Sequence, residues 1–333
     1  MTIRVQPLGF VEGTAARDAI ASRRALPLAG GPSAFTLAML HQRGVAARIV
    51  PAVELDPALA APLTQARAYP TGAWPLVMGI VNATPDSFSD GGQFFDPDAA
   101  IAHGRSLRAQ GADLLDIGGE STRPGATPVD AHEEQRRVLP VLRALCADGP
   151  VSIDTRNAST MRAALDAGAS MLNDVSALTY DPDARAVARD AQVPVVLMHM
   201  RGTPQTMQAQ AQYADLLLDV LDELEARIDQ AVAAGIDRAR LVIDPGLGFA
   251  KTPEQSALLL ARVGMLHGLG LPILVGASRK RFLATLGATG DRLGASVAAA
   301  LEAARQGAAI LRVHDVAATV EARAVWRGTH QTG

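Results

Sequence analysis

The feature that most constrains this chain is a regular alternation of short apolar runs with longer alanine- and leucine-rich stretches. The apolar runs have the length and the flanking turn residues of buried strands, and the longer stretches have helical spacing. Eight strands are expected, at residues 76–81, 114–117, 151–153, 171–172, 193–198, 241–243, 273–275 and 310–313. Helices are expected between them at residues 97–110, 130–147, 159–167, 213–234, 256–266 and 292–306.

Eight alternating strand and helix units over about 250 residues predict an α/β fold, a (β/α)8 TIM barrel. A doubly wound open sheet is the second choice. The turn-rich stretch "YPTGAWP" marks a boundary. We therefore expect an N-terminal extension at residues 1–72, a barrel at 73–327 and a tail at 328–333.

The extension contains few residues that could form a core of its own. Its segment 26–44 predicts a turn and one short amphipathic helix, with His41 on the helix surface. We expect this extension to pack on the barrel or to lie at a subunit contact.

Charge and composition exclude several classes of protein. A net charge of −3 gives no basic footprint for nucleic acid, and no apolar stretch reaches the roughly 20 residues that span a membrane. The single cysteine, Cys146, excludes a disulfide framework or a cysteine-ligated zinc site. Arg17, Asp18, Arg23 and Arg24 stand where a signal peptide needs an apolar centre, so a cytoplasmic protein with small-molecule substrates is expected.

Polar residues follow almost every expected strand. An isolated aspartate after a strand is usually a helix cap, but the carboxyl ends of barrel strands meet on one rim, where a repeated set predicts a ligand site. The set comprises Asn82, "GGESTRPG" (118–125), Asp154, Asn173, Asp174, His199, Asp244, "GASRK" (276–280) and "RVH" (312–314).

The residue types on this rim indicate a flat heterocycle. Asp154, Asn173 and Asp244 offer acceptors and one amide, which suit a guanine-like or pterin-like edge. Arg312 can stack on a ring face, and Met198 can supply an apolar contact on the other side.

The same rim has features of a phosphate site. Asn82, His314 and the glycine-rich turns could meet an anion, because the last loops of such barrels often hold phosphate. The side-chain oxygen of Asn82 would also suit Mg²⁺ shared with phosphate oxygens.

Several long motifs together resemble the dihydropteroate synthase family. The resemblance runs from about residue 74 to 327, in the order and spacing of that family. It is carried by "GIVNATPDSFSDGG" (79–92), "DIGGESTRPG" (116–125), "SIDT" (152–155), "NDV" (173–175), "LMHMRGTPQTMQ" (197–208), "DPGLGFAKT" (244–252), "VGASRKRF" (275–282) and "RVHDV" (312–316).

The resemblance implies a pterin-binding barrel that acts as a transferase in folate biosynthesis. Such enzymes join 6-hydroxymethyl-7,8-dihydropterin pyrophosphate to p-aminobenzoate and release pyrophosphate and 7,8-dihydropteroate. Sulfonamides compete with p-aminobenzoate. The resemblance also implies Mg²⁺ as cofactor and a homodimer.

Residue by residue, the resemblance implies three groups of contacts. The pterin would be held by Asp154, Asn173, Asp244 and Lys280, with Met198 and Arg312 against its faces. The pyrophosphate would be held by Asn82, Arg312 and His314, with the metal at Asn82. The p-aminobenzoate pocket would be shaped by Phe88, Thr122, Pro124 and Lys280, and the loops closed over it would be organised by Asp86, Asp90 and Arg123.

The implied mechanism is a dissociative substitution at the pterin methylene. Mg²⁺, Arg312 and His314 would stabilise the leaving group, and Asp154 with Asp90 would support the cation. The catalytic set implied is therefore Asp86, Asp90, Arg123, Asp154, Lys280, Arg312 and His314. Arg281 stands where many relatives have serine, which departs from the pattern beside the p-aminobenzoate pocket.

Other interpretations remain open from the residues alone. Lys280 near the end of the seventh strand could be the Schiff-base lysine of an aldolase-type barrel. A methyltetrahydrofolate-binding methyltransferase domain, or a non-catalytic pterin-binding relative, would use a similar pocket without handling pyrophosphate.

Overall fold

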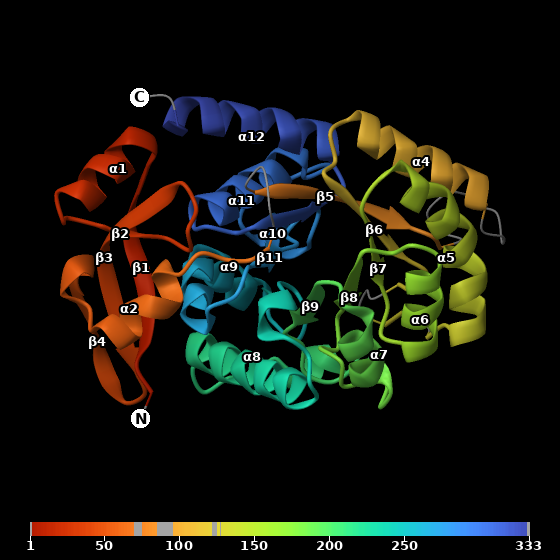
Figure 1. The fold of residues 1–333 in the computed structure, drawn as a ribbon, viewed down its shortest axis with the longest axis horizontal. Coiled ribbons are helices and arrows are strands. Elements are labelled where there is room, and N and C mark those ends of the chain that lie inside the picture. Colours follow the sequence, from red (N-terminus) through yellow and green to blue (C-terminus); the bar gives the residue numbers. More distant parts are fainter. Residues whose placement is uncertain (1, 70–74, 85–95, 122–124, 127, 332–333) are drawn as a thin grey trace.

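Eight parallel strands form the barrel that the alternating pattern predicts (Figure 1). The structure, a computed structural model, describes residues 2–69, 75–84, 96–121, 125–126 and 128–331. The barrel strands are β5 (Leu76–Asn82), β6 (Leu114–Gly118), β7 (Val151–Asp154), β8 (Met171–Asp174), β9 (Val195–Met198), β10 (Leu241–Asp244), β11 (Leu274–Val275) and β12 (Ile310–Val313).

The strands pair in the order β10-β9-β8-β7-β6-β5-β12-β11. A parallel bridge between Ile243 and Ile273 joins the two ends of this order, so the sheet is nearly closed. Closure removes the exposed edges of the sheet, and it distinguishes the fold from the doubly wound alternative. The prediction of a (β/α)8 barrel is confirmed.

Helices surround the barrel: all six expected segments contain one, and α7, α10 and α12 lie outside those segments. They are α4 (Pro97–Ala109), α5 (Ala131–Leu145), α6 (Ala158–Asp166), α7 (Ala184–Ala191), α8 (Leu216–Ala233), α9 (Pro253–Ala261), α10 (Phe282–Thr285), α11 (Leu293–Arg305) and α12 (Val316–Gln331). Short 3₁₀ segments are η2 (Cys146–Asp148), η3 (Met207–Gln210), η4 (Arg238–Arg240) and η5 (Val263–Leu269).

Capping side chains set several helix starts. Asp96, Asp130 and Asp215 each accept backbone N–H groups at the starts of α4, α5 and α8, and Thr252 with Gln255 forms a capping box at α9. None of the helices in the described part of the chain is long and apolar enough to cross a membrane. Helix α12 continues beyond residue 327, where the sequence places the end of the barrel.

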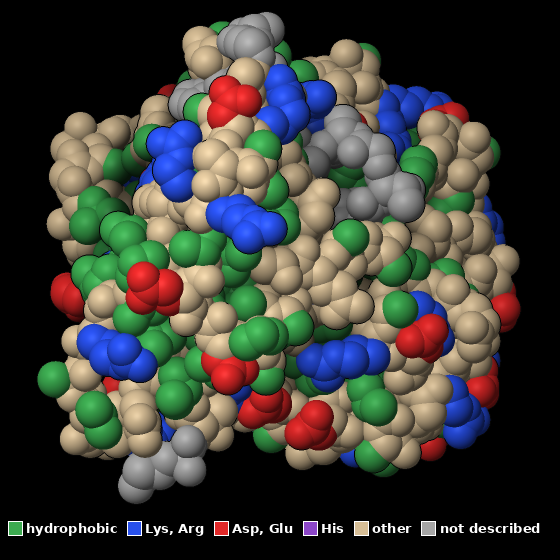
Figure 2. All heavy atoms as spheres, turned by 60° about the vertical axis from the view of Figure 1, so that its left-hand side comes forward, with side chains coloured by type: hydrophobic (Ala, Val, Ile, Leu, Met, Phe, Trp, Pro, Cys, Tyr) green, Lys and Arg blue, Asp and Glu red, His purple; other side chains and the backbone are tan. Residues whose placement is uncertain are grey.

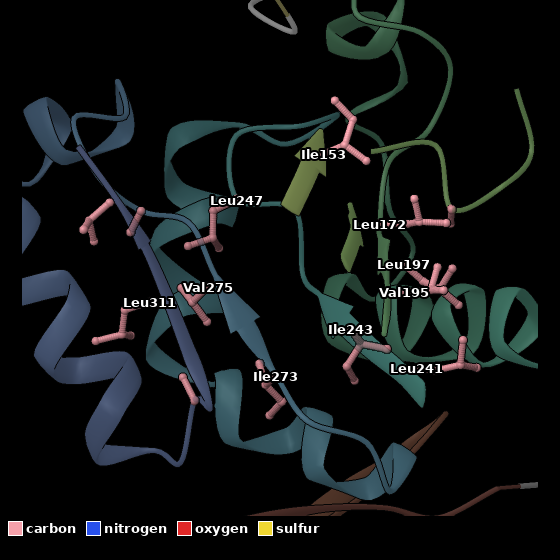
Figure 3. Packing of buried hydrophobic residues seen from close by; sticks show 14 of the residues in the cluster. Ile153, Leu172, Val195, Leu197, Leu241, Ile243, Leu247, Ile273, Val275 and Leu311 are labelled. Carbon is pink, nitrogen blue, oxygen red and sulfur yellow. The ribbon is translucent and has the colours of Figure 1, made fainter. Parts of the chain in front are cut away.

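Alternation along the strands divides the buried side chains into two clusters. Outward-pointing residues pack under the helices, as Figure 3 shows for Ile153, Leu172, Val195, Leu197, Leu241, Ile243, Ile273, Val275 and Leu311. Inward-pointing residues fill the barrel, namely Met78, Leu114, Met171, Val196, Val242, Leu274 and Ile310. Tyr69 packs against this inner cluster. The inward positions at the carboxyl ends of the strands lie outside this apolar cluster and can hold polar, functional side chains.

The N-terminal residues form a four-stranded antiparallel sheet with two helices. Its elements are β1 (Arg4–Glu12), α1 (Gly13–Ala21), β2 (Leu26–Pro27), β3 (Ser33–Gln42), β4 (Val45–Pro51), η1 (Ala52–Glu54) and α2 (Pro57–Thr64). Strand β3 lies between β1 on one side and β2 and β4 on the other. Contrary to the expectation from the sequence, the sheet has a core of its own, in which Val5, Leu28, Phe35, Ala38 and Leu63 are buried.

The prediction of a helix within residues 26–44 is wrong. Those residues form β2, a turn and β3, and His41 lies on a strand, where its Nε2 is 3.2 Å from Gln6 Oε1. Alanine, leucine and methionine favour helices locally, but β3 is the central strand of a sheet, and pairing on both sides outweighs that weak preference.

This sheet lies beside the amino-terminal ends of the barrel strands, away from the predicted rim (Figure 1). Arg4 of β1 is buried and pairs with Asp222 and Glu225 of α8 at 2.7 and 2.6 Å. Figure 2 brings this side of the molecule forward, where hydrophobic side chains gather at the surface. Leu37 and Ile49 are among the exposed apolar residues of the sheet.

Candidate functional site

Strand register brings the predicted polar residues into one layer of the barrel. Asn82 is paired with Gly118, Gly118 with Asp154, and Asp154 with Asn173. Asp244 is likewise paired with Met198 on the neighbouring strand. Since these residues share the inward parity of the apolar cluster, they form the last interior layer, at the carboxyl ends of the strands.

Arg312 on β12 connects two carboxylates across the barrel. Its Nε donates to Asp116 Oδ2 at 2.6 Å, and its Nη2 donates to Asp154 Oδ2 at 2.7 Å. Asn173 Nδ2 also donates to Asp116 Oδ2, at 3.0 Å. Burial raises the pKa of Asp154 above its ordinary value, although the charge of Arg312 opposes this, and Asp116 adds to the rise. Two buried acids that hold the same guanidinium fix its plane.

Asp116 is the site residue that sequence reasoning misses. It is fully buried on β6, and its Oδ1 has no hydrogen-bond partner within the described residues. A signal is present, because Asp116 stands two positions after Leu114 inside an apolar strand and therefore faces the barrel interior. A carboxylate in such a run is costly unless it is paired.

Lys280 lies against the loop that follows β10. Its Nζ donates to the carbonyl of Leu247 and lies 4.8 Å from the ring centre of Phe249. Burial lowers the pKa of Lys280 to about 8, and the charge of Asp244 works against that change. Burial also raises the pKa of Asp244, which Lys280 opposes. The opposite charges of buried Asp244 and half-buried Lys280 therefore stabilise each other at this end of the barrel.

The turn after Asp244 requires glycine. Gly246 has φ +65°, and a Cβ there would lie 2.0 Å from the backbone oxygen of His199. Its N–H donates to Asp244 Oδ1 at 2.7 Å. The side chain of Leu247 is buried in the outer cluster near Val275 (Figure 3), which anchors this loop to the barrel wall.

A second polar cluster, formed by Lys251, His199, Glu223 and Arg201, contacts the same loop on the side away from Lys280. Lys251 Nζ lies 2.8 Å from His199 Nδ1, and His199 Nε2 lies 3.1 Å from Glu223 Oε2 on α8. Arg201 donates to the same carboxylate, with Nε 3.0 and 3.1 Å from its oxygens. Burial, helped by the charge of Lys251, lowers the pKa of His199 to about 4. The sequence places His199 on the rim, and the structure turns its ring into this cluster.

His314 follows β12 and is held by Ser278. The His314 backbone N–H donates to Ser278 Oγ at 3.1 Å, and its Nδ1 lies 3.0 Å from the same oxygen. Asn82 ends β5 half-buried. Among the described residues there is no group of three or more His, Cys, Asp or Glu side chains that could hold a metal ion.

Six predicted site residues lie outside the described part of the chain. They are Asp86, Phe88, Asp90, Thr122, Arg123 and Pro124. Near one of these stretches Glu120 is well held, since it accepts two hydrogen bonds from Arg156, at 3.0 and 2.7 Å.

Comparisons with known proteins agree on one family. The model of the pterin binding enzyme family matches residues 78–314. The chain is 45% identical over 260 residues to the dihydropteroate synthase of Synechocystis, covering 75% of this chain and 90% of the relative. It is 47% identical over 256 residues to that of Mycobacterium leprae, covering 74% and 90%.

Solved structures give the same result. The dihydropteroate synthase of Xanthomonas albilineans with 4-aminobenzoic acid superposes with a TM-score of 0.73 at 51% identity, covering 78% of this chain and 94% of that one. The same protein in complex with 7,8-dihydropteroate gives a TM-score of 0.71 at 48% identity, covering 78% and 95%. A Yersinia pestis dihydropteroate synthase with a sulfonamide drug gives 0.72 at 44% identity, covering 77% and 94%.

Proposed function

The chain belongs to the dihydropteroate synthase family of pterin-binding enzymes, and from this premise we propose how its residues divide the work of the reaction. Its activity is that of a dihydropteroate synthase, a transferase of folate biosynthesis. The observation that carries the assignment of roles is the pairing of Arg312 with the two buried acids Asp116 and Asp154 at the end of the barrel.

The pterin is assigned to the polar interior layer. Asp154, Asn173 and Asp244 present acceptors and an amide to its amino and ring N–H groups, and Lys280 donates to its carbonyl edge. Met198 and Arg312 lie on the two faces of the ring in this proposal. The guanidinium is supported by its pairs with Asp116 and Asp154, so the face contact needs little reorganisation.

The pyrophosphate is assigned to Asn82, Arg312 and His314. Arg312 and His314 supply positive charge and donors, and the Ser278 contact orients the imidazole of His314. The amide oxygen of Asn82 is a hard ligand that suits Mg²⁺ when phosphate and water oxygens complete the shell. When bound there, the metal neutralises charge on the leaving group.

The reaction breaks the bond between the pterin methylene and the pyrophosphate oxygen, and the electron pair leaves with the pyrophosphate. The amine of p-aminobenzoate forms the new C–N bond and then loses one proton to solvent. Asp154, beside the ring, supports the positive charge of the dissociative transition state. The p-aminobenzoate pocket is assigned to Phe88, Thr122, Pro124 and Lys280. Asp86, Asp90 and Arg123 are assigned to the loops that close over it.

We also propose a cellular location, an oligomeric state and a domain organisation for the protein. We assign it to the cytoplasm as a homodimer, with residues 1–72 as an extension, 73–327 as the catalytic barrel and 328–333 as a tail. Light scattering on the purified chain tests the dimer, and a monomer at micromolar concentration would contradict it.

The deciding experiment mixes the protein with 6-hydroxymethyl-7,8-dihydropterin pyrophosphate, p-aminobenzoate and Mg²⁺ and follows the release of pyrophosphate. Release should require p-aminobenzoate and yield 7,8-dihydropteroate. Tight pterin binding without any release would favour a methyltransferase-like or non-catalytic relative instead. Borohydride trapping of a carbonyl substrate on Lys280 would support the aldolase alternative.

A further inference from the structure

Lys251 has an unusual environment for a lysine. The residue is 2% exposed, and its ammonium has three contacts: His199 Nδ1 at 2.8 Å, the carbonyl of Gly246 at 3.1 Å and the carbonyl of Phe249 at 3.0 Å. An ammonium has three N–H donors and no acceptor, so all of its hydrogen-bonding capacity is used. Two of the three contacts go to the loop between Asp244 and Lys251.

The charge of this ammonium is not neutralised by a direct ion pair. Within the described residues no carboxylate lies at salt-bridge distance from Lys251, and burial lowers its pKa to about 7. Burying a cation without a paired anion costs several kcal/mol. The side chain is instead held by its three hydrogen bonds, which tie it to His199 and to the loop.

The contacts of His199 show how the ammonium is held in place. Burial keeps the ring of His199 neutral, and the ionised carboxylate of Glu223 must accept the proton on Nε2, so Nδ1 accepts the hydrogen bond from Lys251. Hydrogen bonds from His199 and Arg201 lower the pKa of Glu223 to about 2, although burial acts in the opposite direction. The carboxylate is therefore ionised and fixes the imidazole, which in turn fixes the ammonium.

The loop held by Lys251 lies between two substrate-binding side chains. Asp244 stands at its start and accepts the N–H of Gly246, while Lys280 donates to the carbonyl of Leu247 and lies over the ring of Phe249. Lys251 binds the carbonyls on either side of that contact, at Gly246 and Phe249. Movement of these carbonyls would change the position of Asp244 relative to Lys280.

We propose that Lys251 is a positioning residue for the synthase reaction, which fixes the loop 245–250 so that Asp244 and Lys280 face the pterin together. This inference rests on the roles proposed above for Asp244 and Lys280. Lys251 itself lies behind the loop and acts on the substrates only through it.

The test compares Lys251→Met, which keeps the length of the side chain and removes the ammonium, with His199→Gln, which keeps a polar partner for it. The matched control is Arg4→Met, which removes a buried cation from the N-terminal sheet, away from the loop. For each variant we would measure thermal stability, kcat, the KM of both substrates, and hydrogen exchange of the amides at 246–250.

We expect Lys251→Met to raise the KM for the pterin substrate by about 10- to 100-fold, because small misplacements of binding groups have effects of that size. Exchange at 246–250 should become faster in this variant, and His199→Gln should show a smaller change of both kinds. Arg4→Met should lose stability and keep both KM values.

A rescue experiment separates positioning from general stability. Lys251→Ala with added ethylammonium should regain a low KM, whereas ethanol at the same concentration should have no effect. Unchanged KM values in folded Lys251→Met would overturn the proposal, and so would exchange at 246–250 equal to that of the parent. If the parent itself released no pyrophosphate, the proposed function would fail, while pterin affinity and hydrogen exchange would still decide the role of Lys251.

Discussion

At the scale of single residues, Arg312 connects the acids of the last interior layer of the barrel. Its guanidinium is held from two directions, by Asp116 and Asp154, so a substitution at either acid changes the orientation of the cation as well as the local charge. Lysine cannot replace this arrangement, since an ammonium does not present a planar set of donors.

Replacement of Asp154 by asparagine should weaken binding of the pterin pyrophosphate. The amide presents a donor where the ring N–H groups need an acceptor, and it loses the charge that pairs with Arg312. Charge-assisted hydrogen bonds contribute roughly 1.5–3 kcal/mol, so we expect a loss of affinity of about 10- to 100-fold by calorimetry. Glu302→Gln, which breaks an exposed pair with Arg305, is the control, and equal affinities for both variants would refute the assignment of Asp154.

The single residues differ in how well the sequence predicts them. Asp154, Asn173, Asp244 and Arg312 are recognisable because each stands at or near the end of a strand. Asp116 lies inside an apolar strand, where its inward parity is the one sequence signal and its partners are not evident. Lys251 lies on the far side of a loop, and its position is not distinctive until the barrel is closed. Local sequence reports where strands end, whereas partners across the barrel depend on tertiary structure.

At the scale of elements, the loop after β10 depends on the backbone of Gly246. Alanine there would have an unfavourable positive φ and would place its Cβ against the carbonyl of His199. Gly44 is the matched control, because it has φ +73° and a Cβ added there would meet no atom within 4 Å. A left-handed conformation alone costs about 1–2 kcal/mol, so we expect Gly44→Ala to lose about that much stability and Gly246→Ala clearly more. Urea unfolding measures both, and equal losses would show that the loop can relax.

A histidine at the junction of two elements makes stability depend on pH. His267 in η5 is buried, with Nε2 2.9 Å from the carbonyl of Gln306, and burial lowers its pKa to about 3. The unfolded chain takes up a proton near pH 6.5, so stability decreases as pH falls from about 6.5 towards 3, by at most about 1.4 kcal/mol per pH unit for one group.

His267→Gln should remove that contribution. Urea unfolding at pH 7.5 and at pH 5.0 measures the difference. Between these two pH values the free energy of unfolding should fall by about 2 kcal/mol more in the parent than in the variant. Glutamine can still donate to the carbonyl of Gln306. The same pH dependence of stability in both proteins would mean that folding does not lower the pKa of His267, so that its ring is protonated at pH 5.0 in the folded state as well.

The elements also show where sequence reasoning succeeds. The sequence places the barrel strands within a few residues, because buried parallel strands are short apolar runs bounded by turn residues. It predicts a helix in place of strand β3, since the pairing partners β1 and β4 lie elsewhere in the chain and the residues of β3 favour a helix. Short segments of mixed propensity follow their tertiary neighbours.

At the scale of the whole molecule, the N-terminal sheet is joined to the barrel by charged side chains on α8. Arg4 is buried and pairs with Asp222 and Glu225, whereas Arg43 is about half exposed and pairs with Asp219 and Asp222. The difference in burial should decide which pair contributes more, because exposed ion pairs add little to stability.

Arg4→Met should therefore destabilise the protein by about 1–3 kcal/mol, since it leaves two carboxylates without their buried donor. Arg43→Met should cost less than about 1 kcal/mol. Urea unfolding measures both changes, and hydrogen exchange in β1 should be faster in the first variant only. A larger loss for Arg43→Met would contradict this account of the junction.

The three donors of Lys251 also limit the routes by which this sequence can evolve. Lys251, His199 and Glu223 come from three separate segments, and each satisfies a polar group of the next. Replacement of any one of them leaves a buried donor or acceptor on its neighbour without a partner, which costs about 1–3 kcal/mol. Viable lineages should therefore change these three positions jointly or not at all, which is strong epistasis between segments that lie far apart in the sequence.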